Sequence, residues 1–220
     1  MSIFRVKICG ITNARDAKNA ATVGADAIGF NFYPHSRRYV QPLRAAEIAQ
    51  TLPDSLQKVG VFVNASIDTI LTVADQVGLD AIQLHGDEPA ELLQQLSSRM
   101  VIRAFRCAAG SISEIRRYLD RCGLLHAAPA AVLLDACQPR QYGGTGQIAD
   151  WKSARQIVTE LVDTPCLLAG GLTRENVARA IAAVGPTAVD VAGGVEIRPG
   201  QKDLEKMRGF VKAARAALGV

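Results

Sequence analysis

The sequence has no apolar run that approaches the roughly 18 residues of a membrane-spanning helix. Its first residues include Arg5 and Lys7, where a secretory signal peptide needs a continuous apolar stretch. Aromatic residues make up only 5% of the 220 residues and charged residues 21%, but 49% are hydrophobic, which excludes a disordered or low-complexity chain. We therefore expect a folded cytoplasmic protein with a large aliphatic core and no membrane partner.

Closely spaced cysteines are also absent. The chain has five cysteines and no C-x-x-C pair, because they lie at Cys9, Cys107, Cys122, Cys137 and Cys166. Their odd number argues against a disulfide framework, and their spacing argues against structural zinc. We expect most of them to be small buried hydrophobic side chains.

A concentrated excess of charge is absent as well. The 25 Lys and Arg residues against 21 Asp and Glu residues give a net charge of +4, with the basic residues scattered along the chain. A nucleic-acid-binding protein usually gathers them on one face. We therefore expect small anionic ligands and no nucleic acid.

Eight short aliphatic runs recur along the chain, each followed by a polar turn and a helical pattern. Near-continuous apolar character is typical of parallel strands that are covered on both faces. The expected strands span residues 3–8, 27–32, 58–63, 81–84, 101–105, 131–134, 166–169 and 188–192.

The segments between the runs carry helix start and stop signals. The expected starts are Asn13, Pro42, Ser66, Asp87, Ser111 with Glu114, Asp150, Thr173 and Asp203. The expected ends lie near Gly24, Gly78, Gly123, Val162, Gly185 and Leu218.

Eight strands that alternate with eight helices fit either a doubly wound open sheet or a closed barrel. No G-x-G-x-x-G follows the first strand, and glycine pairs follow the seventh and eighth strands instead. This distribution favours an α/β fold with a closed, parallel, eight-stranded sheet, a (βα)8 TIM barrel. No linker or shift in composition divides the chain, so we expect residues 1–220 to form a single catalytic domain.

The two glycine pairs, Gly170-Gly171 and Gly193-Gly194, precede helix starts. Glycines can simply make tight turns between strand and helix. However, the loops after strands seven and eight are where barrels often hold phosphate, on exposed backbone N–H groups. Two pairs at these two loops favour a phosphorylated small substrate.

Cys9 and Asp135 end two strands on opposite sides of the expected barrel mouth. A thiol and a carboxylate placed in this way could act as base and acid across a bound sugar. A thiolate base needs a lowered pKa, for which Lys7 or Arg38 could supply the positive charge. A lone cysteine is more commonly a buried hydrophobic residue, but Asp135 has no helix to cap, because Ala136 and the residues after it do not open one.

Further polar residues lie where the strands end. Arg38 lies in a loop with a second arginine and two aromatics, which is either an exposed basic loop or a carboxylate-binding one. His85 directly follows the fourth strand, whereas His35 and His126 fit ordinary loop histidines. Residues 136–149 form a long glycine-containing connection that predicts a closing lid.

Motifs along the whole chain resemble the phosphoribosylanthranilate isomerase family. The matching segments are Lys7-Ile8-Cys9-Gly10-Ile11, Ser36-Arg37-Arg38-Tyr39-Val40, Val59 to Asn64, Gln83-Leu84-His85-Gly86, Leu134-Asp135, Gly143-Gly144-Thr145-Gly146, Leu168 to Leu172, Asp190 to Glu196, Pro199-Gly200 and Lys202-Asp203. The last glycine motif has Ala192 and Gly193 where the family often carries serines, so backbone donors remain and hydroxyl contacts are lost.

The resemblance implies a cofactor-free and metal-free Amadori rearrangement of N-(5-phosphoribosyl)anthranilate in tryptophan biosynthesis. By this analogy Asp135 is the general acid, Cys9 is the general base and Arg38 binds the anthranilate carboxylate. The glycine pairs bind the phosphate, and Gln83, His85 and Asp190 line the pocket. We expect a monomer, with a dimer as the alternative.

Three other functions remain open at this point. The first is the related isomerase of histidine biosynthesis or a dual-substrate enzyme, although that chemistry typically uses a carboxylate where this chain has Cys9. The second is a non-catalytic barrel that binds phosphosugars. The third is an aldolase that works through a Schiff-base lysine, for which Lys7 and Lys58 are poorly placed.

Overall fold

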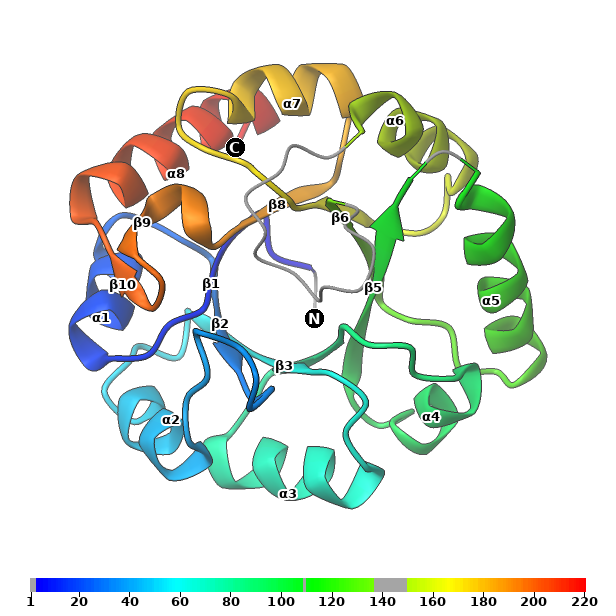
Figure 1. Ribbon diagram of the computed structural model, residues 1–220, viewed down its shortest axis with the longest axis horizontal. Helices are drawn as coiled ribbons and strands as arrows, with labels where there is room; N and C mark the ends of the chain where they lie inside the picture. The colour runs from blue at the N-terminus through cyan, green and yellow to red at the C-terminus, as the bar shows by residue number, and fades with distance from the viewer. Residues whose placement is uncertain (1–2, 109, 137–149) are drawn as a thin grey trace.

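The computed structural model describes residues 3–108, 110–136 and 150–220, so the predicted lid at 136–149 lies outside the described residues except for Ala136, the last residue of a strand. Its strands form a closed parallel barrel in chain order, because the first strand pairs with both the second and the eighth (Figure 1). The strands are β1 Val6–Cys9, β2 Ala27–Asn31, β3 Gln57–Phe62, β4 Ala81–Leu84, β5 Met100–Cys107, β6 Ala131–Ala136, β7 Cys166–Leu168 and β8 Ala188–Val191. The barrel prediction is confirmed, and each expected strand overlaps an observed one.

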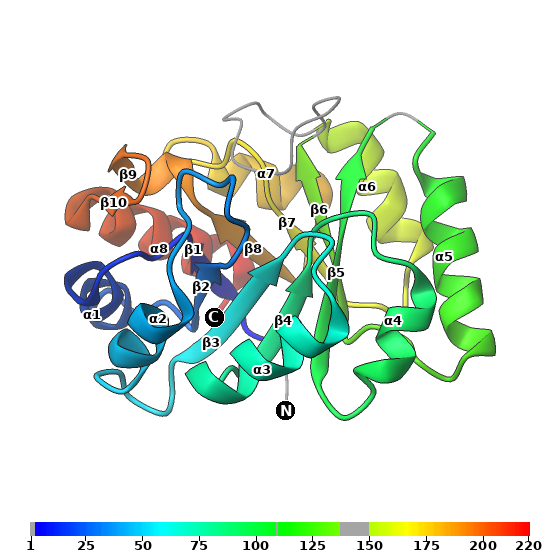
Figure 2. The ribbon, with the colours of Figure 1, turned by 60° about the horizontal axis from the view of Figure 1, so that its bottom comes forward.

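Helices form an outer ring around the barrel (Figure 1). They are α1 Ala14–Thr22, α2 Pro42–Ala49, α3 Ile67–Val77, α4 Ala90–Gln95, α5 Ile112–Leu124, α6 Trp151–Glu160, α7 Val177–Val184 and α8 Leu204–Leu218. A 3₁₀ turn, η1 Gly193–Val195, follows β8 and leads into a small antiparallel pair, β9 Glu196–Arg198 and β10 Gln201–Lys202. Figure 2 shows this hairpin beside the face toward which the barrel strands point.

Alternation along the strands separates two apolar layers. On β1, Val6 and Ile8 face outward and join the large cluster between sheet and helices. On β6, Ala131 and Leu133 face inward and join a smaller cluster that fills the barrel interior. Asp135, two residues further on, therefore points inward at the carboxyl end of the barrel.

The N-terminal segment differs from its prediction. A strand was expected from residue 3, but β1 begins at Val6. Phe4 is instead buried in the inner cluster with Ala27 and Val59, where Ile3 packs beside it. The backbone oxygen of Arg5, which follows Phe4, accepts from the N–H of Val189 on β8 and joins this segment to the sheet.

Five helix starts match their predictions. Asn13, Ser66, Asp150 and Asp203 each accept a hydrogen bond from a backbone N–H in the first turn of the following helix, and Pro42 is the first residue of α2. These signals succeed because the partner of each cap lies only two or three residues away.

Two predicted starts are wrong, and a third, Ser111, is correct in position but lacks the expected side-chain cap. Pro89 rather than Asp87 precedes α4, and Asn176 rather than Thr173 precedes α7. Ser111 does precede α5, but its hydroxyl bonds backward to Ala108 and not to the helix. Local turns compete for these side chains, as when the Thr173 hydroxyl accepts from the backbone N–H of Glu175.

Two helices also end at residues that differ from their predicted ends. α5 continues past Gly123 to Leu124, and α6 ends at Glu160, short of Val162. Across the described ranges, no helix is both long enough and apolar enough to cross a membrane.

Candidate active site

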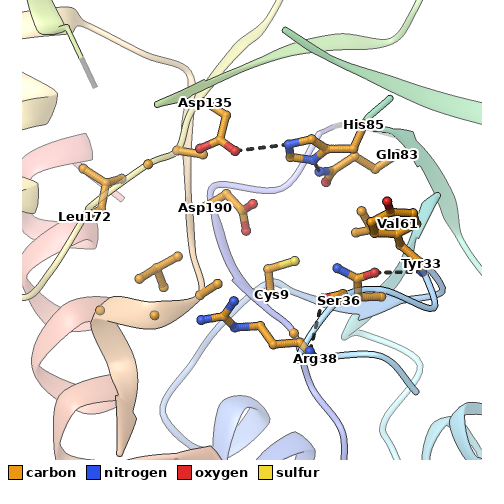
Figure 3. A pocket seen from close by; sticks show the side chains of 18 of the residues that line it. Cys9, Tyr33, Ser36, Arg38, Val61, Gln83, His85, Asp135, Leu172 and Asp190 are labelled. Carbon is orange, nitrogen blue, oxygen red and sulfur yellow. Dashed lines mark hydrogen bonds and ion pairs between the residues drawn. The ribbon is translucent and has the colours of Figure 1, made fainter. Parts of the chain in front are cut away.

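The ten residues singled out from the sequence all line one pocket at the carboxyl end of the barrel (Figure 3). They are Cys9, Arg38, Gln83, His85, Asp135, Gly170, Gly171, Asp190, Gly193 and Gly194. Asp135 and His85 lie on one side, with Cys9 and Arg38 on the other (Figure 3). The fold thus brings together side chains from strands far apart in the sequence.

Cys9 lies at the end of β1 in a space that Gly29 of β2 leaves open. A Cβ on Gly29 would lie 2.7 Å from the Cys9 sulfur and 3.1 Å from Cε of Lys7. Such a contact is too short for any real side chain, so glycine is required there for the thiol and the lysine to share this space.

The electrostatic surroundings of Cys9 differ from the expectation of a lowered pKa. Burial raises the pKa of the Cys9 thiol, and the Asp190 carboxylate raises it further. The positive charges of Lys7 and Lys202, together with a hydrogen bond from Lys7, lower it but do not compensate fully. The net pKa therefore lies above the ordinary value of a cysteine, because burial disfavours the thiolate.

Lys7 is completely buried inside the barrel, one layer below Cys9. Its ammonium nitrogen lies 3.0 Å from Asp190 Oδ1 and 2.9 Å from Gln83 Oε1. Burial lowers the pKa of Lys7, but the charge of Asp190 and the neighbouring Cys9 raise it more, so that the net pKa is above its ordinary value. Lys7 is therefore a buried cation with a carboxylate partner.

His85 joins this group to the other side of the pocket. Its Nδ1 is 2.7 Å from Gln83 Nε2, and its Nε2 is 3.1 Å from Asp135 Oδ2. Asp135 is itself only 7% exposed. The proposed acid thus shares a polar network with Lys7, which contacts the proposed base.

Arg38 is held by a residue that the sequence did not single out. Its Nε and Nη2 donate to the two carboxylate oxygens of Glu196 at 2.9 and 2.7 Å. Lys202 donates to Glu196 at 2.9 Å and to the backbone oxygens of Cys9 and Ala192. Glu196 and Lys202 are both buried, and their only sequence signal was their place in the closing family motifs.

The charges of Arg38 and Lys202 shift the pKa of Glu196. Burial raises the pKa of its carboxyl, but the hydrogen bonds from Arg38 and the charge of Lys202 lower it more. The net pKa is below the ordinary value of a glutamate, and Glu196 remains an anion that binds both cations.

The two glycine pairs meet across the pocket rim. Gly170 and Gly171 both have positive φ, at 87° and 63°. A Cβ on Gly194 would lie 1.8 Å from the backbone oxygen of Leu172, so the loop after β7 and the turn η1 are in backbone contact. Only glycine permits this approach, and it leaves a wall of bare backbone beside the pocket.

Two further basic residues of the barrel strands, Arg103 and Lys58, lie outside the pocket. Arg103 of β5 is buried against Glu88, at 2.9 Å, and donates to the backbone oxygens of Leu84 and Gly86. It supports the loop that carries His85 and does not line the pocket. Lys58 pairs with Asp80 at 3.1 Å at the start of β3, away from the carboxyl ends, which removes it as a Schiff-base candidate.

Comparison with known proteins agrees with this geometry. The family model for N-(5′-phosphoribosyl)anthranilate isomerase matches residues 6–213. The isomerase of Geotalea daltonii is 46% identical over 98% of this chain and 98% of its own. This chain belongs to the N-(5′-phosphoribosyl)anthranilate isomerase family. It is an aldose–ketose isomerase of tryptophan biosynthesis.

Solved isomerases share the fold. The Thermotoga maritima isomerase, which is described as dimeric, is 41% identical and superposes with a TM-score of 0.85 over 97% of this chain and 100% of its own. An isomerase solved in complex with reduced 1-(O-carboxyphenylamino)-1-deoxyribulose 5-phosphate is 39% identical, with a TM-score of 0.79 over the same shares.

Proposed function

We propose that this chain converts N-(5′-phosphoribosyl)anthranilate to 1-(2-carboxyphenylamino)-1-deoxyribulose 5-phosphate with Asp135 as general acid and Cys9 as general base. The observation that carries this assignment is their placement at the ends of β6 and β1, facing the same pocket from opposite sides. An acid and a base on two sides of one sugar can act on two atoms without moving.

The reaction begins with Asp135. Its proton goes to the ribose ring oxygen as the bond from C1 to that oxygen breaks, and the nitrogen lone pair forms a protonated Schiff base. The Cys9 thiolate then removes the proton from C2. The electron pair of that C–H bond forms the C1–C2 double bond of an enolamine, while the C=N electrons return to nitrogen.

Tautomerisation completes the rearrangement. The hydroxyl of the enolamine loses its proton as the C2 carbonyl forms, and C1 gains a proton. No electron leaves or enters the substrate overall, so acid–base groups suffice and we propose that no cofactor takes part. The reaction ends with Cys9 protonated and Asp135 deprotonated, and the enzyme must exchange both protons before the next turnover.

The two anionic ends of the substrate fit two regions of the pocket. Arg38 supplies a guanidinium at the rim, which suits the anthranilate carboxylate. The wall formed by Gly170, Gly171, Gly193 and Gly194 suits the phosphate, because bare backbone allows close approach of N–H donors. Gln83, His85 and Asp190 line the same pocket and would face the ribose.

The test is a turnover assay that follows the fluorescence of the anthranilate substrate. We expect activity without added metal or cofactor, including after dialysis against a chelator. The aminoaldose substrate of the histidine-pathway isomerase serves as the comparison. Turnover of that substrate alone would refute the assignment, and binding without turnover of either one would indicate a phosphosugar-binding protein.

We propose a monomer as the working assembly. Within the described part of the chain, the exposed large hydrophobic residues are Tyr39, Leu43, Leu124, Val162, Ile197 and Val220, and of these only Tyr39 and Leu43 lie close together in the sequence. Stable dimers bury larger continuous apolar surfaces. Light scattering of the purified chain decides the point, and a dimeric mass would contradict it.

We place this biosynthetic enzyme in the cytoplasm. Cys9, Cys122 and Cys166 are free thiols, which suits a reducing compartment. Fractionation of the producing cells followed by detection of the chain tests this, and enrichment outside the cytoplasmic fraction would contradict it.

A further inference from the structure

Lys7, Gln83, His85 and Asp135 form a continuous line of hydrogen bonds across the barrel mouth. Lys7 Nζ is 2.9 Å from Gln83 Oε1, Gln83 Nε2 is 2.7 Å from His85 Nδ1, and His85 Nε2 is 3.1 Å from Asp135 Oδ2. Figure 3 shows the last three of these side chains in sequence along one edge of the pocket. The direction of every bond in this line follows from its first member.

Lys7 can only donate. Its ammonium is fully buried and paired with Asp190 at 3.0 Å, and this carboxylate keeps the pKa of Lys7 above its ordinary value against the effect of burial. A charged ammonium has three N–H donors and no acceptor. Whatever group faces it must present an acceptor atom.

Gln83 therefore has one permitted orientation. Its amide must turn Oε1 toward Lys7, because the reverse orientation would place two buried N–H donors against each other. The NH2 group then faces His85, and Nδ1 of the ring must accept this hydrogen bond. A neutral imidazole that accepts at Nδ1 carries its proton on Nε2.

We propose that Lys7 and Gln83 are positioning residues that fix His85 as the Nε2–H tautomer, with that N–H directed at Oδ2 of Asp135. The inference rests on the proposed function, in which Asp135 is the acid. Because Oδ2 accepts from this donor, Oδ2 does not carry the proton that Asp135 transfers. The N–H of His85 then stabilises the carboxylate that forms as the ribose ring opens.

This arrangement also separates two roles for Lys7. Through Asp190 and Cys9 it contributes charge to the base side of the pocket. Through Gln83 it sets the hydrogen-bond direction on the acid side, although the ammonium does not touch Asp135. A buried donor at the centre of the barrel thereby orients a catalytic carboxyl on the opposite wall.

The tautomer can be measured by nitrogen NMR of the full-length protein labelled with ¹⁵N-histidine. The chain has three histidines, and His35→Gln and His126→Gln variants, both outside the pocket, assign the signals by loss. At about pH 8, above the ordinary range of histidine titration, we expect an unprotonated Nδ1 and a protonated Nε2 for His85. A proton on Nδ1 in the unmutated protein would overturn the proposal.

Gln83→Glu tests the amide directly. A carboxylate at this position still accepts from Lys7 but cannot donate to His85, so Nδ1 of His85 should gain a proton. An unchanged His85 spectrum in this variant would also overturn the proposal. We expect its kcat to fall about tenfold while KM changes less than about twofold, since roughly one charge-assisted hydrogen bond is lost in the transition state.

Lys7 is tested without leaving Asp190 as an uncompensated buried anion. The double variant Lys7→Met/Asp190→Asn removes the ion pair, and the unmutated protein is its reference. The double variant should show both His85 tautomers, whereas the unmutated protein should show Nε2–H alone. If the double variant keeps Nε2–H alone, Lys7 does not set the tautomer.

Failure of this proposal can be distinguished from failure of the proposed function. An unmutated protein that lacks isomerase activity but holds the Nε2–H tautomer removes the catalytic assignment and leaves the orienting network. An active enzyme with Nδ1–H removes the network and leaves the assignment. A Gln83→Glu variant that raises KM with unchanged kcat would show that Gln83 binds substrate and does not position His85.

Discussion

Glu196 and Arg38 form a bidentate ion pair, in which both carboxylate oxygens lie within 2.9 Å of guanidinium nitrogens. The two residues lie 158 positions apart in the chain, on the hairpin after β8 and in the loop after β2. Lys202 and the backbone N–H of Gly200 bind the same carboxylate. The rim of the pocket is therefore fixed by a single buried anion.

Replacing this anion should weaken the fold. We expect Glu196→Gln to lower the free energy of unfolding by about 3 kcal/mol, because two cations would lose their common partner in a buried site. Urea denaturation measures the change. Glu47→Gln is the control, since Glu47 forms a well-exposed pair with Arg44 and should change stability by less than about 1 kcal/mol. Equal effects of the two substitutions would contradict the prediction.

The same comparison should depend on pH. The folded-state pKa of Glu196 lies below its ordinary value, so its contribution to stability is complete above the unfolded-state pKa of about 4.3. That contribution is lost as pH falls through the lower folded-state pKa. The stability difference between Glu196→Gln and the unmutated protein should therefore be constant from neutral pH to about 5 and shrink at lower pH. A difference that grows on acidification would have the wrong sign.

The proposed acid and base should be individually necessary for turnover. We expect Cys9→Ser and Asp135→Asn each to lower kcat by at least about 100-fold, which is the lower range for loss of a general acid or base. The dissociation constant of a non-reacting product analogue should change little. Cys166→Ala is the control, because Cys166 is buried on β7 outside the pocket. Near-normal turnover in either active-site variant would refute the role given to that residue.

The base should also shape the pH–rate profile. Burial keeps the pKa of Cys9 above its ordinary value in the free enzyme, and the reaction needs the thiolate. We therefore expect kcat/KM to rise with pH through and beyond about 8.5, the ordinary pKa of a cysteine thiol. Lys202→Met removes a positive charge near Cys9 and should move this limb further to the alkaline side. A profile already flat at pH 7 would contradict the raised pKa.

Binding of the anthranilate carboxylate and binding of the phosphate should depend on different residues. Arg38→Ala should weaken inhibition by anthranilate by roughly 10- to 100-fold, the range for a lost hydrogen bond to a charged group, and leave inhibition by ribose 5-phosphate nearly unchanged. Gly194→Ala should do the reverse, because its methyl group would displace the Leu172 backbone from the glycine wall. Inhibition constants for both compounds decide this, and loss of phosphate affinity alone in Arg38→Ala would exclude it as the carboxylate site.

Much of the pocket could be predicted because strand ends are visible in the sequence. Cys9, His85 and Asp135 each lie at or directly after the carboxyl end of an aliphatic run, and parallel strands in a barrel bring those ends together. The pKa of Cys9 could not be predicted in the same way. Nearby cations were foreseen, but the depth of burial that outweighs them depends on the packed barrel.

Other parts of the site could not be predicted from neighbouring residues in the sequence. Glu196 and Lys202 follow the last barrel strand in a short hairpin, where a charged pair usually faces solvent. The buried position of Lys7 was likewise not evident, since its partners Gln83 and Asp190 belong to β4 and β8. The wrong helix start at Asp87 had no local signal either, because the Asp87 backbone N–H donates to Oδ1 of Asn64, which lies 23 positions away in the loop after β3.

The sequence by itself determined the alternation of strands and helices, the closed barrel and the family, because apolar periodicity, capping residues and glycine pairs act over a few neighbouring positions. Because the sequence has few aromatics and no closely spaced cysteines, its core had to be built from aliphatic side chains, and a barrel provides such a core. Only the tertiary structure decided which buried charges meet, including Lys7 with Asp190 and Glu196 with Arg38. Those contacts depend on distances across the barrel, which no pattern of neighbouring residues in the sequence records.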